Sequence, residues 1–467
     1  MTYEDIVRLY AETDERLRSL VQQLENGNLS TRRVEQLNRE IEQIVAELAE
    51  RAGLNVATLI GNEYRTGVAI AVNQMIAAGR AKESIDVSVK SLQHQRAVQA
   101  ISDEAFYSIL ESTDNMAMDT KERIKKAVQL ANEKSLTLGM SRKESTKQAV
   151  AELNTKGITG IVAKNGAEIP ADKYVAGVVH YHQRKAHVTG TENMATQNGY
   201  DLVYVNYVGI TCEHCARKQG RVYSLSGNDK RWPHMTDEYK PPYHSHCVHS
   251  ISIWVEEYQS PEEVERLLDI SNKLGEETRS EQHINRYKEI QAQKAQLNAD
   301  RKQWERYREV VQETPKTFSA FRRMKNSNAE QWQLTQLDYR RQRRLTANPE
   351  LALPNAGKAS AADAKFSKYL FNPDNPVGYA KGAAFTSRLG YNSDNWKKLQ
   401  SEIIERSSLY PSTLKLTDQH GSRYEQKMIL YGVTGKPTNV VVGWNVANNE
   451  TKMTTAYIKE VKSGGGN

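Results

Sequence analysis

All three cysteines of this 467-residue chain lie in two short segments, CEHC at 212–215 and PPYHSHCVHS at 241–250. A C-x-x-C turn presents two thiolates from one tight loop, and a tetrahedral zinc ion needs two further soft or borderline donors. The second segment can supply them, provided that the fold brings the two segments together. Five donors then compete for four places: Cys212, Cys215, His244, Cys247 and His249.

Two more histidines lie beside these donors. His214 is inside the C-x-x-C turn, where its side chain is expected to point away from the metal. His246 lies between His244 and Cys247 and remains a competitor, so the spacing leaves open which histidine completes the site. The alternative is a set of unconnected polar residues on loops.

The cluster predicts a structural Zn²⁺ site rather than a catalytic one. A catalytic zinc keeps an open position beside a general base, and Glu213 is the only acid close to the donors in sequence. Three cysteines cannot form a disulfide framework, and this usage is typical of metal-held thiolates in a reducing cytoplasm.

Length and composition indicate several domains with long exposed helices. A chain of 467 residues exceeds the usual size of one core, and its apolar content is 38% with a mean hydropathy of −0.70. The net charge of +7 favours an acidic partner such as nucleic acid, although a soluble basic protein would show the same value. The N-terminus is charged from Glu4 on, which argues against a signal peptide. The apolar window 67–79 is too short to span a bilayer and predicts a buried helix, so no stable membrane span is expected.

The first 156 residues are predicted to form a helical scaffold. Apolar residues recur at three- and four-residue steps over 6–24 and again over 34–48, which predicts two antiparallel helices separated at Asn26-Gly27-Asn28. Gly53 lies near the expected end of the second helix. Further helices are expected around 64–78, 98–110 and 121–138, the last of them ending at Gly139.

Residues 157–256 differ from the helical scaffold, because short alternating segments replace the helical periodicity, and they predict a small α+β core. The alternating DLVYVNYVGI at 201–210 predicts a strand that leads directly into CEHC, and shorter strands are expected at 221–223 and 251–255. Each cysteine cluster therefore lies beside a strand, as in zinc knuckles.

The C-terminal half is predicted to contain an arm, a linker and a separate domain. A helix begins at Ser260-Pro261 and runs to about 312, and a second one over 314–345 ends in the basic run YRRQRRL, so that 257–346 forms a long basic helical arm. Residues 347–362 lack periodicity and predict a linker. The domain at 363–462 is expected to hold a helix at 392–407 and strands at 427–431, 439–445 and 453–458, before a flexible tail at 463–467.

The predicted fold class is therefore α+β, mainly α. A long helical N-terminal scaffold and a helical arm surround a small zinc-stapled α+β core, and a separate small α+β domain follows.

The central region resembles the minor capsid (minor head) proteins of tailed phages. The matching pieces are YVAGVVHYHQRKAHVTGTENMATQNGYDLVYV, ITCEHCARKQGRVYSLSG and PPYHSHCVHSISIW. They contain a C-x-x-C that is followed by Gly220 and Tyr223, and a downstream H-x-x-C-x-H. Where that family usually has Pro-Asn between its histidine and cysteine, this chain has Ser245-His246. The resemblance extends over about residues 1–345 and includes the polar helix RYKEIQAQKAQLNADRKQWERYREVV.

This resemblance implies a virion protein of low copy number, located in the capsid interior or at the portal vertex and present in the host cytoplasm during assembly. Its implied role is in head assembly or in DNA packaging and ejection. The implied partners are portal protein, scaffold or major capsid protein, and packaged DNA. The basic arm fits contact with DNA phosphates, whereas YRRQRRL could equally be a solvated helix face or a linker flank.

The C-terminal domain resembles the barnase/EndoU/colicin/RelE-type nuclease-like domains that are sometimes fused to phage minor capsid proteins. The pieces are KYLFNPDNPVGYAKGAAFTSRLGYNSDNWKKL, GSRYEQKMILYGVTGKPTNVVVGWNV and TKMTTAYI. The resemblance implies a metal-independent ribonuclease with RNA as its substrate.

RNA cleavage by such a fold needs a base for the 2′-hydroxyl and groups that stabilise the phosphorane. Lys381 could supply charge, and Thr454 or Thr455 a hydroxyl donor. His420 or Arg423 could act as base or phosphate clamp, although His420 lies outside the matching pattern. The alternative is an inactive fold used for binding, with Lys381 and His420 as ordinary surface residues.

Two functional hypotheses follow, and they are compatible. The first is a structural virion protein with a zinc-stapled core that carries a toxin-like domain. The second is a phage-delivered ribonuclease whose N-terminal part directs it to the virion. A third hypothesis, a cytoplasmic zinc-finger protein that binds nucleic acid, lacks support from the resemblance.

Overall fold

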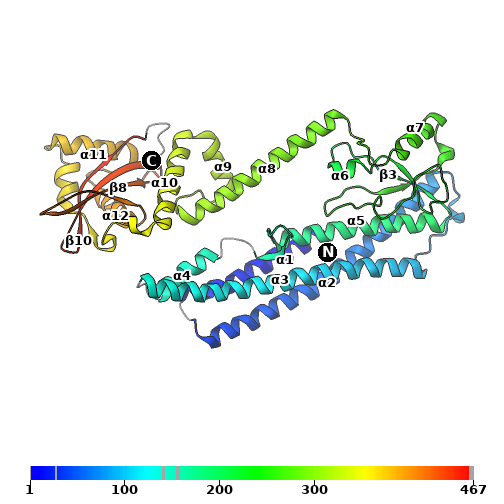
Figure 1. Ribbon diagram of the computed structural model, residues 1–467, viewed down its shortest axis with the longest axis horizontal. Coiled ribbons are helices and arrows are strands. Elements are labelled where there is room, and N and C mark those ends of the chain that lie inside the picture. The colour runs from blue at the N-terminus through cyan, green and yellow to red at the C-terminus, as the bar shows by residue number, and fades with distance from the viewer. Residues whose placement is uncertain (1, 27–28, 139–141, 154–157, 462–467) are drawn as a thin grey trace. The chain divides into compact units, whose positions relative to one another are not determined.

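A computed structural model describes residues 2–26, 29–138, 142–153 and 158–461. The chain divides into two compact units, Met1–Ala292 and Gln293–Asn467. Long helices dominate the first unit, and the second contains a sheet covered by helices (Figure 1). The predicted fold class, mainly α within α+β, is confirmed.

The first unit is built on long helices. Its helices are α1 Tyr3–Gln22, α2 Thr31–Ala77, α3 Leu92–Leu138, α4 Arg142–Leu153, α5 Ala171–Gln197, α6 Glu213–Ala216 and α7 Pro261–Asn272, and α8 Glu281–Val310 begins in it. Its strands are β1 Thr159–Val162, β2 Glu168–Pro170, β3 Leu202–Val205, β4 Val222–Ser224 and β5 Ile251–Ile253. None of the helices in the described ranges has the length and apolar character that crossing a membrane requires.

Helices α2 and α3 are each longer than the sequence predicts. The glycine pattern suggested a stop near Gly53, yet α2 continues through Gly53 and Gly61 for 47 residues. Gly53 gives room to the ring of Phe106 on α3, which would lie 2.6 Å from a Cβ at this position. The two helices expected at 98–110 and 121–138 are one helix, α3, and Gly139 lies outside the described residues.

Helix starts follow local capping chemistry. Thr2 and Asp5 form a capping box at the start of α1, and Ser30 caps α2 by accepting a hydrogen bond from the Arg33 amide. The predicted start at Ser260-Pro261 is also confirmed, since Ser260 accepts from the Glu263 amide. The long helix predicted from there is interrupted, however, because residues 273–280 form a loop between α7 and α8.

Helices α2 and α5 approach each other closely at two glycines. A Cβ on Gly67 would collide with the carbonyl oxygen of His187, and one on Gly190 would collide with that of Tyr64. The hydroxyl of Thr191 donates to the Gly67 carbonyl at 3.1 Å across this contact. The absence of side chains at both positions therefore sets the spacing of the two helices.

A small antiparallel sheet, in the order β4-β3-β5, lies against this helical layer. Its inner face packs Val203, Val205 and Ile251 against Val188 of α5. The amide of Ile253 donates to the side chain of Gln74 on α2 at 2.9 Å. Strand β3 is shorter than predicted, since the chain leaves the sheet after Val205 and forms the loop that leads to CEHC.

The second unit begins with helices that pack through aromatic rings. It contains the end of α8, then α9 Phe318–Ser327 and α10 Ala329–Ala347. Tyr307 stacks on Tyr339 with ring centroids 4.2 Å apart, and Trp332 lies against both Tyr307 and Phe321. The basic run YRRQRRL is therefore partly internal, because Tyr339 is in this stack and Arg341 is only 9% exposed.

The rest of the second unit is a sheet between two helical layers. Its remaining elements are β6 Ala359–Ser360, α11 Pro376–Leu389, α12 Trp396–Arg406, β7 Ser412–Asp418, β8 Gly421–Leu430, β9 Thr438–Ala447 and β10 Glu450–Ile458. The strand order is β6-β10-β9-β8-β7, antiparallel except for β6 with β10. One face packs on Phe385, Leu389, Leu399 and Ile403 of α11 and α12, and the other packs on Leu334 and Leu337 of α10.

The segment 347–362, expected to be a linker, belongs to this domain. It contains short 3-10 turns and strand β6, which pairs in parallel with β10 at Thr451. Leu353 is 2% exposed in the core that Phe385 and Trp444 share. The absence of helical periodicity, which predicts a linker, here reflects a segment that follows the edge of a sheet.

Alanine at Gly67 tests the close α2–α5 contact. Because a Cβ would overlap the His187 carbonyl, we expect Gly67→Ala to lower the free energy of unfolding by about 1–3 kcal/mol. Gly61→Ala is the matched control on the same helix, where a Cβ meets nothing within 4 Å, and there we expect a gain of up to about 1 kcal/mol. Urea unfolding followed by helical circular dichroism measures both. Equal effects of the two variants would contradict this contact.

Candidate metal centre

The CEHC turn is a short helical knuckle that follows β3. Cys212 is the N-cap of α6, and its sulfur accepts a hydrogen bond from the Cys215 amide at 3.5 Å. Cys215 is 1% exposed, whereas Cys212 is partly exposed. The two sulfurs therefore come from one turn, as the spacing predicted.

The second segment returns to this knuckle just before β5. The Cys247 amide donates to the His244 carbonyl at 3.0 Å, which closes a tight turn and directs Cys247 inward. The sulfurs of Cys215 and Cys247 are 4.0 Å apart, and Cys247 is 1% exposed. The structure thus brings together the two segments that the sequence predicted to meet.

All five predicted donors lie around Cys215. The Nε2 atom of His244 is 3.4 Å from the sulfur of Cys212 and 3.1 Å from that of Cys215. The Nδ1 atom of His249 is 3.5 Å from the sulfur of Cys247. The donors form two groups of three that share Cys215, namely Cys212, Cys215 and His244, and Cys215, Cys247 and His249.

The distance between the two buried sulfurs suits a tetrahedral zinc ion, whereas the described donors lie within 4.8 Å of one another only in groups of three. Zn–S bonds of about 2.3 Å place two thiolates on one zinc about 3.8 Å apart, close to the observed 4.0 Å between Cys215 and Cys247. Three thiolates and one imidazole form an ordinary structural zinc set. The residues present therefore fit this metal, with one histidine in excess.

The hydrogen bonds of the two histidines differ. His249 is buried, and its Nε2–H donates to Oε1 of Gln219 at 2.8 Å, an oxygen that also accepts from the Val208 amide. This arrangement leaves the lone pair of Nδ1 facing the sulfurs. A metal-bound histidine normally donates its second N–H to a fixed acceptor in this way.

His244 lacks such an acceptor. Its Nδ1 faces the amide N–H of His246 at 3.3 Å, which favours a proton on Nε2 rather than a lone pair directed at the metal. The hydrogen bonding therefore favours His249 over His244 as the fourth ligand.

The other two histidines lie outside the donor set. His214 is exposed, and its ring packs edge-on against Tyr243 at 6.1 Å, in agreement with its expected outward direction. His246 is also exposed, and its ring lies 6.0 Å from that of His180. Neither belongs to a described group of donors.

The contact between the two buried thiols shifts their pKa values in opposite directions. The hydrogen bond from the Cys215 thiol lowers the pKa of Cys247, and His249 adds to this effect. The same contact, together with burial, raises the pKa of Cys215. A thiolate at Cys247 is the species that binds a metal, and a divalent cation would allow Cys215 to ionise as well.

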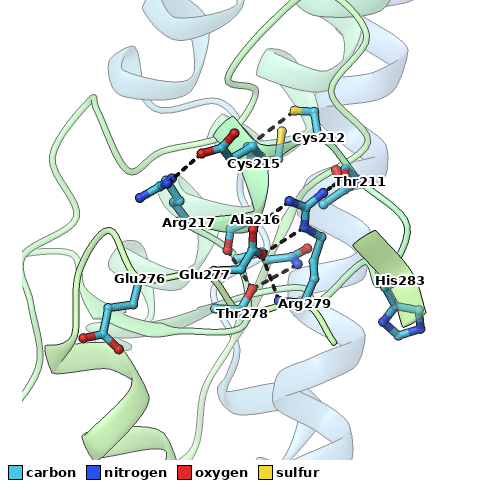
Figure 2. Close-up of polar contacts among 12 residues, drawn as sticks. Thr211, Cys212, Cys215, Ala216, Arg217, Glu276, Glu277, Thr278, Arg279 and His283 are labelled. Atoms are coloured by element: carbon cyan, nitrogen blue, oxygen red, sulfur yellow. Dashed lines mark hydrogen bonds and ion pairs between the residues drawn. The ribbon is translucent and has the colours of Figure 1, made fainter. Parts of the chain in front are cut away.

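A third segment, the loop between α7 and α8, holds the knuckle in place (Figure 2). The guanidinium of Arg279 donates to the carbonyl of Thr211 at 2.5 Å, and the hydroxyl of Thr278 donates to that of Ala216 at 2.6 Å. Arg217 of the knuckle in turn donates to the carbonyl of Gly275 at 2.9 Å. The loop therefore binds both ends of the CEHC turn.

Sequence reasoning did not identify the residues that support the donors. Gln219 links His249, Val208 and Thr278. Arg221, 1% exposed, donates to one backbone carbonyl at the end of α7 and to two in the α7–α8 loop. The available signal was the polar pair Gln219 and Arg221 at the entrance to a short strand.

The five candidate catalytic residues of the C-terminal domain lie at separate places. Lys381, on α11, donates to the hydroxyl of Tyr369 at 3.2 Å. His420 and Arg423 are exposed at the β7–β8 turn, where Arg423 pairs with Asp418 at 3.1 Å. Thr454 is exposed and Thr455 half-buried, both on β10.

The strand register shows their separation. Arg423 is paired with Asn445 and Thr455 with Gly443, so that strand β9 lies between the two side chains. That spacing is about 10 Å across the sheet. Lys381 lies on α11, the helix that packs against the face of the sheet to which Ala456 belongs. Ala456 is the neighbour of Thr455 in strand β10. The described residues at these positions do not converge on one point, and a ribonuclease site stays a prediction.

Comparison with known families agrees with this architecture. Residues 352–460 match a domain of unknown function, DUF6883, whose start inside the 347–362 segment is consistent with that segment belonging to the domain. No curated protein and no solved structure matches the chain. The family model for phage minor capsid protein 2 matches residues 29–344, which include the whole metal centre and its supporting loop. Since this match covers more than half of the sequence, the chain belongs to the phage minor capsid protein 2 family.

Proposed function

We propose that the chain is a structural component of a phage head at or near the portal vertex, in which a zinc ion staples the small α+β core. The family match over 29–344 is the observation that carries the virion role. Portal protein, scaffold or major capsid protein, and packaged DNA are the proposed partners. The chain would assemble in the host cytoplasm and remain in the particle, at the vertex or in the capsid interior.

The proposed zinc ion connects two segments directly, and hydrogen bonds link this pair to a third. Cys212 and Cys215 come from the knuckle, Cys247 and His249 from the segment before β5, and Gln219 and Thr278 link this set to the α7–α8 loop. The sheet between them has strands of three or four residues, which is too short to be stable by itself. In this role the metal supplies folding energy and no chemistry.

Removal of one thiolate tests the staple. We expect about one zinc per chain by elemental analysis of the purified full-length protein, and loss of that zinc in Cys247→Ser, because a buried thiolate ligand disappears. We also expect the unfolding midpoint to fall by on the order of 10 °C, since several kcal/mol of metal binding are lost.

His246→Ala is the matched control, because it changes an exposed histidine in the same turn and should keep the zinc. His249→Ala should release zinc at a lower chelator concentration than His244→Ala, as the hydrogen bonds of the two histidines indicate. Folded protein without metal would contradict the staple, and the reverse order of the histidine variants would contradict the assignment of His249.

The virion role predicts that the chain is part of the particle. We expect mass spectrometry of purified virions to detect it in far fewer copies than the major capsid protein, and gold-labelled antibody to mark opened particles at one vertex. Its absence from purified virions would contradict the proposal, and labelling over the whole shell would contradict the vertex location.

A single assay distinguishes the two interpretations of the C-terminal domain. Because the five candidate residues do not converge, we expect the full-length chain to leave RNA intact, at the level of a buffer control. RNA cleavage by the chain that Lys381→Ala abolishes would restore the ribonuclease interpretation. Cleavage that persists in Lys381→Ala would indicate a different site in the chain or a contaminant.

A further inference from the structure

The positive charge of the chain is concentrated in one segment of the second unit. Residues 293–347 contain thirteen lysines and arginines against six aspartates and glutamates, a net charge of +7. This value equals the formal net charge of all 467 residues, so the rest of the sequence is balanced. The basic character of the protein is therefore a local property of α8, α9 and α10.

Part of this charge is already compensated inside the fold. Arg341 is 9% exposed and donates to the side chain of Asn439 at 2.7 Å. Arg322 and Lys325 share the buried carboxylate of Asp300 at 3.2 and 2.7 Å. Contacts within the fold therefore account for these three cations.

Arg301 and Arg308 on α8 are exposed, and neither has a carboxylate within 4.0 Å among the described residues. They are seven residues apart and so lie two helical turns apart on one face of the helix. Glu305 lies between them on α8, and it forms no ion pair with either within that distance. Further exposed cations lie in the same part of the chain: Lys302, Arg306, Lys316 and Arg323.

Two aromatic rings hold these guanidinium groups. The guanidinium carbon of Arg301 is 5.0 Å from the centroid of Phe318, and that of Arg308 is 4.8 Å from the centroid of Trp304. The two rings lie 5.8 Å apart, and Trp304 is anchored by a hydrogen bond from its Nε1–H to the carbonyl of Pro315 at 2.8 Å. Arg322 covers Phe318 from a second direction at 5.9 Å.

This arrangement orients the two arginine side chains for binding to phosphate groups. A guanidinium that rests on an aromatic ring keeps N–H donors free for a bidentate contact, and loses less side-chain entropy when it binds than a freely rotating side chain does. Arginine clusters without carboxylate partners are typical of surfaces that bind the nucleic-acid backbone.

The rings also indicate which nucleic acid would bind. Single-stranded nucleic acid is usually held by bases that stack on exposed aromatic faces. Here Trp304 and Phe318 are half-buried, pack on each other and are covered by guanidinium groups, so they offer no open platform. Contacts to the phosphates of a duplex need only the outward N–H groups.

We propose that Arg301 and Arg308, held on Phe318 and Trp304, form the centre of a surface that binds the phosphate backbone of double-stranded DNA without sequence preference. The proposal rests on the virion role, in which packaged DNA is a partner, and it assigns that partner to a defined surface. It is independent of the metal centre.

The test uses the full-length protein and fluorescently labelled DNA duplexes of two unrelated sequences, with fluorescence anisotropy measured between about 50 and 200 mM salt. We expect both duplexes to bind equally and with a steep decrease of affinity as salt rises. The double variant Arg301→Gln/Arg308→Gln should bind roughly tenfold or more weakly at the lowest salt. It should also flatten the slope of log K against log salt by about 2, one for each lost phosphate contact.

Lys397→Gln/Lys398→Gln is the matched control. It removes two exposed cations from helix α12 in the same unit, and Lys397 also lies over an aromatic ring, that of Trp396, at 5.7 Å. We expect this variant to keep the wild-type affinity and slope. Circular dichroism should show the wild-type helical signal for both double variants, since all four side chains are exposed.

Three results would overturn the proposal. These are the absence of duplex binding by the wild-type chain, an equal loss in the two double variants, and tighter binding of the corresponding single strand than of the duplex at the same salt. None of them would change the zinc content or the presence of the chain in virions, so failure of this surface is distinguishable from failure of the proposed function.

Discussion

The contact between the sulfurs of Cys215 and Cys247 is the constraint on which the small core of the first unit depends. Both side chains are 1% exposed, and they bring the CEHC knuckle and the segment before β5 to within 4.0 Å of each other. The contact lowers the pKa of Cys247 and, together with burial, raises that of Cys215, so ionisation of one thiol disfavours ionisation of the other. A divalent cation removes that limit, because it compensates the charge of several thiolates at once.

The helical layer behind the core gives the metal centre its fixed position. Helix α5 packs on α2 at Gly67 and Gly190, and its Val188 enters the core of the three-stranded sheet. The sheet, the knuckle and the α7–α8 loop are thus joined to the helix pair α2 and α5 on one side and to the donor cluster on the other. This arrangement favours the proposed structural role over a catalytic one, because the acid nearest in sequence, Glu213, is exposed and paired with Arg217.

The sequence was most informative where the chemistry is specific to residue type, and least informative where packing decides. The Cys/His spacing predicted which five side chains lie together, because few residue types can bind a soft metal. It could not choose between His244 and His249, since that choice depends on Gln219, which becomes a neighbour only in the folded chain. Gly53 suggested a helix end because its packing partner, Phe106, is distant in sequence. The 347–362 segment suggested a linker because strand β6 is only two residues long.

The difference between buried and exposed charges explains how the second unit can carry a net positive charge and still be well packed. Its buried charges are satisfied within the fold. Asp338, 0% exposed, accepts hydrogen bonds from the hydroxyls of Tyr410 and Tyr431 at 2.6 and 2.8 Å, and burial raises its pKa. Arg406 pairs with Glu402 and Glu313.

A carboxylate that pairs within the core cannot neutralise a cation on the surface, so the arginines on the exposed face of α8 remain uncompensated. Within the basic run YRRQRRL, Arg341 and Gln342 are buried, and Gln342 donates to the carboxylate of Asp338. The exposed arginines that rest on Trp304 and Phe318 are separated in sequence by intervening residues, and only the helical fold places them on one face.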